Sequence, residues 1–245
     1  MTERGYPGLV SWRVGTSGWQ YRDWRGDFYP QRLPQRLWLE HYAQTFDTVE
    51  VNNAFYRLPE RSVFEGWKQR TPAGFVVTVK GSRYLTHIKR LKDPAEPVAR
   101  LLERCRGLGR KRGPILLQLP PTLQAAPQLL DETLKQFPRT VRVAVEPRHE
   151  SWWSDEVRAV LTRRKAALVW ADRGEQALNP LWVTASWGYL RLHRGRSDWP
   201  YSTRALQRWA DQLRECFTEG YAYANNDPGG AAPRDAVKLR EMLER

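Results

Sequence analysis

Cysteine is scarce in this chain of 245 residues, and the sequence features of redox, zinc and membrane proteins are missing. Its two cysteines, Cys105 and Cys216, lie far apart, and neither belongs to a CxxC pair. Two buried, reduced thiols in a cytoplasmic protein are therefore expected. No run approaches 18 apolar residues, and the first ten residues lack the apolar centre of a signal peptide. The resulting expectation is a soluble, cytoplasmic protein with no membrane partner.

Common cofactor and linker patterns are missing as well. No GxGxxG follows the first apolar run, which weakens a dinucleotide interpretation, and no HExxH is present. We therefore expect no cofactor. Acidic and imidazole side chains leave a divalent metal as a minor alternative, with Glu146, His149, Asp172, His193 and Asp227 as its ligands. No segment rich in Pro, Gly or Ser divides the chain, so residues 1–245 are expected to form a single domain.

What the chain does contain is a series of eight short apolar runs, each ending in polar residues. The runs begin near residues 12, 48, 75, 114, 141, 167, 188 and 221. Helical periodicity between them predicts helices over residues 33–46, 97–108, 127–137, 155–161, 202–217 and 235–243. Strands that alternate with helices indicate an α/β protein with a parallel sheet. Eight such units in this length predict a single TIM-type (β/α)8 barrel of parallel strands.

Alternation along the predicted strands sorts their side chains into two sets. Neighbouring residues of a strand point to opposite faces, and the face that meets the helices must be apolar. In the second run Val49 and Val51 then face the helices, while Glu50 faces inward. The same rule, applied to three more runs, gives an inward set of charged groups: Glu50, Lys80, Glu146, Arg191 and His193.

These inward groups are candidates for acid–base chemistry at the carboxyl ends of the strands. Charges confined together shift each other's pKa, which brings carboxylates and lysines into the range of proton transfer near neutral pH. We predict Glu50, Lys80, Glu146 and His193 as catalytic residues. The predicted substrate-binding residues are polar or aromatic residues at or after strand ends: Trp19, Tyr21, Asn52, Asn53, Tyr56, Arg83, His87, Gln118, Arg148, His149, Asp172, Arg191, Asn225 and Asn226. The alternative is a buried ion-pair network that only stabilises the fold.

Positive charge dominates the composition, with a formal net charge of +13. Residues 80–112 hold eleven Lys or Arg residues against Asp93, Glu96 and Glu103. A basic face of this size attracts nucleic acid or phosphorylated substrates, whereas a solvated helix face is the simpler interpretation. The charge leaves nucleic acid open as a partner.

Several short motifs resemble the domain-of-unknown-function family 72, also called YecE-like proteins. The matching segments are residues 15–19, 46–53, 80–89 and 118–121, Glu146 with Arg148-His149, Arg191-Leu192-His193, and Asn225-Asn226-Asp227. They occur in order over residues 13–243. The resemblance implies a TIM-type barrel and no particular activity.

Three functional hypotheses follow. The first is an enzyme (a hydrolase, lyase or isomerase) that acts on a small anionic or sugar-like substrate, with or without a phosphate group, in the barrel mouth by carboxylate and lysine acid–base chemistry. The second is a nucleic-acid-binding or nucleic-acid-processing protein that uses the basic face of residues 80–112. The third is a barrel that binds a ligand without turnover.

Overall fold

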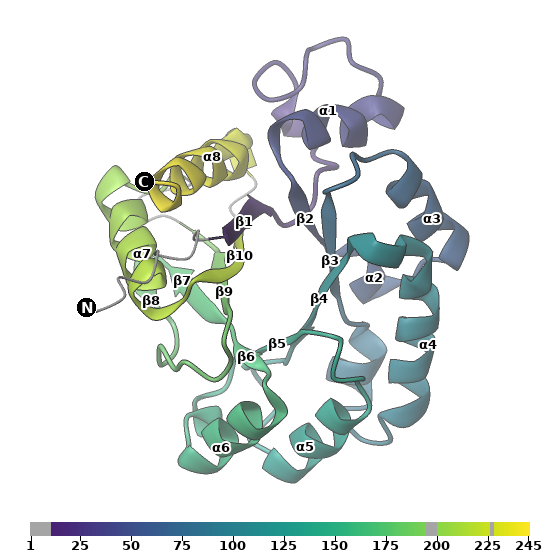
Figure 1. The fold of residues 1–245 in the computed structure, drawn as a ribbon, viewed down its shortest axis with the longest axis vertical. Coiled ribbons are helices and arrows are strands. Elements are labelled where there is room, and N and C mark those ends of the chain that lie inside the picture. The colour runs from purple at the N-terminus through teal and green to yellow at the C-terminus, as the bar shows by residue number, and fades with distance from the viewer. Residues whose placement is uncertain (1–10, 195–199, 226–227) are drawn as a thin grey trace, which may run out of the picture.

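The computed structural model describes residues 11–194, 200–225 and 228–245, in which strands surround a common interior and helices lie outside them (Figure 1). The strands are β1 (Ser11–Thr16), β2 (Thr48–Val51), β3 (Val76–Lys80), β4 (Arg112–Gln118), β5 (Val143–Glu146), β6 (Ala167–Leu168), β7 (Trp170–Arg173), β8 (Gln176–Ala177), β9 (Gly188–Leu192) and β10 (Glu219–Ala224). The helices are α1 (Trp38–Thr45), α2 (Asn53–Tyr56), α3 (Arg61–Gln69), α4 (Ala95–Cys105), α5 (Pro127–Lys135), α6 (Asp155–Arg164), α7 (Thr203–Cys216) and α8 (Ala231–Leu243).

The strands form two sheets of five, so the predicted single barrel of eight parallel strands is wrong. One sheet has the order β1-β10-β9-β7-β8 and the other β2-β3-β4-β5-β6. The second sheet is parallel throughout, whereas β8 pairs antiparallel with β7 in the first. The protein is α/β, and all eight apolar runs form strands. The error lies in how their edges meet.

The two sheets meet first between β1 and β2, and at this seam the side chain of Tyr42 takes the place of a backbone hydrogen-bond ladder. β1 and β2 share only an isolated bridge, between Ser17 and Glu50. Beside it, the Tyr42 hydroxyl accepts a hydrogen bond from Thr16 N at 2.9 Å and donates one to Thr48 O at 3.0 Å. A Cβ at Gly15 would lie 2.3 Å from Thr48 O, so the close approach of β1 to β2 requires glycine there.

The second seam results from a break in the sixth apolar run. Its first half, β6, pairs with β5, and its second half, β7, pairs with β9. At the break, the Asn179 amide donates to Val169 O at 2.7 Å and accepts from Ala171 N at 3.0 Å. The Thr184 hydroxyl accepts from Leu168 N at 2.8 Å. Side chains thus satisfy backbone groups that a continuous sheet would have paired.

The alternation predicted for the strands is present, and it separates two apolar clusters. Val49, Val51, Val77 and Val79 belong to the large cluster beneath the helices. A small second cluster fills the interior: Leu116, Ala144, Ala167, Val169, Trp187, Tyr189 and Tyr223. Polar residues of the same strands share this interior, and they make up the candidate site.

The helices follow the predicted pattern with one omission. Helices α1 and α4 to α8 lie within or overlap the six predicted ranges, whereas α2 and α3 occupy a connection for which none was predicted. Cys105 is buried, but Cys216 is exposed, so the expectation of two buried thiols is wrong for Cys216. Among the helices described, none has the length and apolar character needed to cross a bilayer.

Candidate functional site

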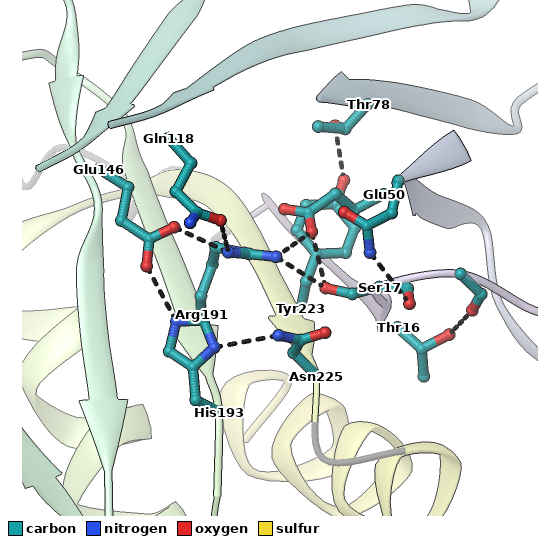
Figure 2. A network of polar contacts seen from close by, with 12 residues as sticks. Thr16, Ser17, Glu50, Thr78, Gln118, Glu146, Arg191, His193, Tyr223 and Asn225 are labelled. Carbon is teal, nitrogen blue, oxygen red and sulfur yellow. Dashed lines mark hydrogen bonds and ion pairs between the residues drawn. The ribbon is translucent and has the colours of Figure 1, made fainter. Parts of the chain in front are cut away.

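A buried ion-pair network occupies the interior near the carboxyl ends of the strands, with Arg191 at its centre (Figure 2). Arg191 lies on β9, in the first sheet, and both of its carboxylate partners lie in the second. Its terminal nitrogens donate to Glu50 at 2.6 Å and to Glu146 at 2.7 Å. All three side chains are at most 1% exposed. The guanidinium therefore joins the two sheets across the interior.

Both oxygens of Glu50 accept hydrogen bonds, from two residues of β9 and from Ser17 at the end of β1. Its Oε1 accepts from Arg191 and from the Ser17 hydroxyl, the latter at 2.7 Å, and its Oε2 accepts from the Tyr189 hydroxyl at 2.5 Å. Nearby, the Tyr223 hydroxyl lies 2.8 Å from that of Thr48 and 2.7 Å from that of Thr78, another link between the sheets. Charge is tolerated in this interior because each charged group has several partners.

Glu146 is held ionised by the cations around it. Its Oε2 accepts from Arg191, and its Oε1 lies 2.7 Å from Arg148 and 2.9 Å from His193 Nε2. Burial opposes ionisation, but the positive charges of Arg191 and Arg148 and the contact with His193 hold the pKa of Glu146 well below its usual range. A carboxylate in this state is a weak proton acceptor.

His193 has three polar neighbours. The Asn225 amide nitrogen lies 3.0 Å from Nδ1, whereas Nε2 lies 2.9 Å from Glu146 Oε1 and 3.0 Å from a terminal nitrogen of Arg148. With Asn225 donating to Nδ1, Nε2–H donates to Glu146, and the Arg148 nitrogen approaches it without a hydrogen bond. This tautomer is assigned from the network. Burial, which outweighs the charge of Glu146, lowers the pKa of His193, in agreement with a neutral ring. Gln118 completes the set at 3.5 Å from Arg191.

Lys80, at the end of β3, differs from every other charge of this group. Its ammonium lies 4.3 Å from the centre of the Phe55 ring, and among the described residues it forms no hydrogen bond or ion pair. Burial, together with the charge of Arg191, lowers the pKa of Lys80 to about 8. An amine in this state exchanges protons near neutral pH.

An arginine-lined pocket of about 290 Å³ opens at the ends of β5, β7 and β9. Arg148, Arg173, His193 and Arg194 line it, and none of them is acidic. Arg148 and His193 are among the site residues that the sequence predicts, whereas Arg173 and Arg194 are not. A usable signal was present, because each of the two follows directly on a residue already singled out, Asp172 or His193.

A smaller pocket of about 170 Å³ lies at the ends of β1 and β2, and it collects four of the predicted residues: Trp19, Tyr21, Asn52 and Asn53. The indole of Trp19 is 4% exposed and packs edge-on against Trp67. Asn53 donates to Gln20 at 3.0 Å, whereas the buried side-chain oxygen of Asn52 has no hydrogen-bond partner among the described residues. The accessible chemistry of this pocket is therefore that of amides more than of aromatic walls.

The remaining predicted residues are dispersed. His87 packs against Phe55 at 4.9 Å, Arg83 is exposed, and Tyr56 is 81% exposed. His149 caps a short helical turn through Ser151 N. Asp172 is fully buried, and its oxygens accept from Tyr201 at 2.5 Å and Trp209 at 2.8 Å, away from both pockets. Asn226 and Asp227 lie outside the described residues.

The cations of residues 80–112 do not all lie on one face, because Lys80 and Lys111 lie at opposite ends of the strands. Lys80 lies at the carboxyl end of β3, whereas Lys111 lies just before β4, at the opposite end of the parallel strands. Lys111 is nearly buried and donates to the backbone oxygens of Lys68 and Thr71, both at 2.6 Å. Within the part of the chain that the structure describes, no three acidic, histidine or cysteine side chains are grouped as metal ligands.

Comparisons with known proteins agree with this fold. The family model for "Protein of unknown function DUF72" matches residues 13–245, whereas a search of the curated proteins finds no match. A DUF72 family protein from Thermotoga maritima is 27% identical; the match covers 96% of this chain and 100% of that one, with a TM-score of 0.85. A DUF72 family protein from Enterococcus faecalis, at 18% identity, has a TM-score of 0.80 over 96% of each chain, a likeness that shows the fold alone. On the evidence of the family model, the chain belongs to the DUF72 family.

Proposed function

We propose that the protein is an enzyme that binds a small, sugar-like anion at the carboxyl ends of its strands, and that Lys80 transfers a proton to or from it. The observation that carries this proposal is the contrast between Lys80 and the two interior carboxylates. Glu50 and Glu146 are engaged by Arg191, whereas the Lys80 ammonium has no partner among the described residues. Proton transfer is therefore assigned to the lysine.

The anion-binding part of the proposal rests on the arginine-lined pocket. Three arginines and a neutral histidine surround it, and arginine suits phosphate and carboxylate because its guanidinium donates two parallel hydrogen bonds. One buried polar atom of this pocket, Arg148 Nε, lacks a hydrogen-bond partner among the described residues. Buried polar groups of this kind are usually satisfied, and a bound anion would satisfy this one.

The reaction class follows from the state of the lysine. A pKa of about 8 leaves roughly a tenth of Lys80 neutral at pH 7, which is enough for a general base or an imine-forming amine. The charge of Arg148, which lines the arginine-lined pocket, would stabilise an anion that develops on the substrate. Isomerase or lyase chemistry, begun by removal of a proton next to a carbonyl group, uses this arrangement best. Glu50, Glu146 and His193 then serve as positioning residues.

A proton-exchange experiment tests the proposal. Small phosphorylated and carboxylated sugars are incubated with the protein in D₂O, and exchange of carbon-bound hydrogen is followed by NMR. We expect exchange in at least one compound and a loss of about 100-fold or more in Lys80→Met. The matched control is Lys89→Met, whose lysine is on the same loop but pairs with Asp93. Undiminished exchange in Lys80→Met would contradict the assignment.

Anion binding is tested separately with inorganic phosphate. We expect phosphate to shift the NMR signals of His193 in the wild type and to do so several-fold more weakly in Arg173→Gln. Arg32→Gln, an exposed arginine of the same charge, is the control. Equal binding by both variants would contradict a site at this pocket.

A further inference from the structure

A second basic pocket opens at the amino ends of the strands, which have no part in the proposed function. It has a volume of about 420 Å³, within the size range of small-molecule sites. Its place is defined by Val143, the first residue of β5, and Trp187, which precedes β9. The carboxyl ends of α5 and α6, which lie side by side in Figure 1, form its wall.

The lining of this pocket carries six cations and, among the described residues, no acid. The cations are Lys135, Arg139, Arg142, Arg163, Arg164 and Lys165. Asp131, behind the lining, accepts from Arg164 at 2.7 Å and from Arg163 at 2.8 Å, and Glu219 accepts from Arg142 at 2.6 Å. Two carboxylates thus stand against six cations. Arg139 and Lys165 have no ion pair in the described part of the chain.

Helix termini account for only part of this charge. Lys135 and Arg163 to Lys165 lie at the ends of α5 and α6, where cations offset the partial negative charge of a helix carboxyl end. Two such ends amount to about one negative charge. Arg139 and Arg142, however, lie in the connection that leads to β5, outside both helices. An excess of about three positive charges remains and needs another explanation.

Arg142 is held in place within this pocket, next to buried apolar side chains. The Arg142 guanidinium lies over the Trp187 ring, 5.4 Å from its centre, while Glu219 holds its other side. Phe137, Val141 and Trp187 also line the pocket, and each is at most 8% exposed. A guanidinium fixed in this way loses little conformational entropy when it binds an anion.

The geometry points to a second binding site here, for an oligophosphate anion, either free or as the phosphate chain of a nucleotide. Several cations around one small volume match a ligand with several negative charges close together, which a single carboxylate does not provide. Arg139 and Lys165 supply unpaired charge at the rim, and Arg142 supplies a fixed fork above the indole. The site is independent of the proposed function and would hold if Lys80 had no catalytic role.

Titration with tripolyphosphate tests this site. Binding is measured by calorimetry at about 0.15 M salt, where long-range attraction is screened. Its place is read from the indole N–H signal of Trp187, assigned with Trp187→Phe. We expect this signal to shift in the wild type and the affinity to fall at least tenfold in Arg139→Gln/Lys165→Asn. Asparagine suits position 165, where φ is 54°.

Two controls distinguish binding at this site from attraction by the overall positive charge and from binding at the arginine-lined pocket. Arg32→Gln/Arg57→Gln removes the same charge from exposed positions elsewhere, and Arg173→Gln alters only the arginine-lined pocket; both should leave the Trp187 signal responsive. An equal loss in the exposed control, or an unshifted Trp187 signal, would overturn the site. ATP and a short single-stranded DNA serve as further probes. Tighter binding of ATP identifies a nucleotide, whereas preference for DNA with equal losses in both double variants would reduce the effect to general basicity.

Discussion

Charged side chains have different surroundings in the interior of this protein and at the carboxyl ends of its strands. In the interior each carboxylate of Glu50 and Glu146 has two or more donors, and Arg191 connects them across two sheets that lack a continuous backbone ladder. At the carboxyl ends of the strands, the Lys80 ammonium lies over the Phe55 ring and forms no hydrogen bond or ion pair among the described residues, and the described lining of the arginine-lined pocket contains no acid. Saturated charges stabilise the fold, whereas unsaturated ones leave capacity for a ligand. This difference is the basis on which we propose a functional site at the carboxyl ends of the strands.

Removal of Arg191 should have the largest effect on stability. Arg191→Met leaves two carboxylates buried without their shared cation, so we expect a loss of about 3–5 kcal/mol in the free energy of unfolding, measured with urea at pH 7. The loss should shrink as the pH is lowered toward about 4, because protonation removes the uncompensated charges.

A surface arginine provides the control for that measurement. Arg214→Met breaks an exposed pair with Asp211 and should cost less than about 1 kcal/mol. If Arg191→Met were equally mild, the interior network would not join the sheets, and the contrast with the mouth would fail.

The contribution of Lys80 to stability should increase as the pH rises above about 8. Its pKa is about 8 in the folded protein and 10.5 in a model compound, so between these values the unfolded chain binds more protons. The stability of the wild type should therefore rise, relative to Lys80→Met, by up to about 3 kcal/mol from pH 8 to 10.5. Paired urea titrations measure this difference, in which the ionisation of the tyrosines cancels. A flat difference would mean that the ammonium has a partner.

The seam between β1 and β2 should show the smallest of these effects. Tyr42→Phe leaves Thr16 N without its acceptor in a buried position, and we expect a loss of about 1–3 kcal/mol. Faster hydrogen exchange of the Thr16 amide would locate the effect at the seam. Tyr56→Phe, at an 81% exposed position, is the matched control and should be neutral. Unchanged exchange at Thr16 would show that the hydroxyl does not join the sheets.

Most of the fold could be predicted from periodicity, but its closure could not. Alternation at Val49, Glu50 and Val51 reports which face is apolar, because that pattern is local. Whether neighbouring strand edges pair depends on side chains from distant positions. Tyr42 and Asn179 occupy hydrogen-bonding positions at the two seams, and no local pattern announces either one. Helix α3 was missed for a different reason: only Phe64 and Trp67 of its nine residues are buried, which is a short apolar stripe.

The sequence predicts which residues share the candidate site better than it predicts what each residue does there. Glu50, Lys80, Glu146 and His193 were all assigned acid–base chemistry, because the sequence places each of them inward at or near a strand end. The structure distinguishes them by their partners: Arg191 lies within 2.7 Å of both carboxylates, whereas Lys80 forms no ion pair among residues 11–194, 200–225 and 228–245. Asp172 illustrates the same limit, since its position at a strand end says nothing of Tyr201 and Trp209, which enclose it.

The sequence by itself determined the α/β class, the eight apolar runs that become strands, and the inward set of charged residues, because strand periodicity and burial are properties of neighbouring residues. Only the tertiary structure decided that the strands divide into two sheets, that Arg191 bridges them, and that Lys80 forms no ion pair within the described part of the chain. These features depend on distances between residues far apart in the chain. Hydrogen bonds and ion pairs act over a few ångströms, so their partners are settled only when the chain has folded.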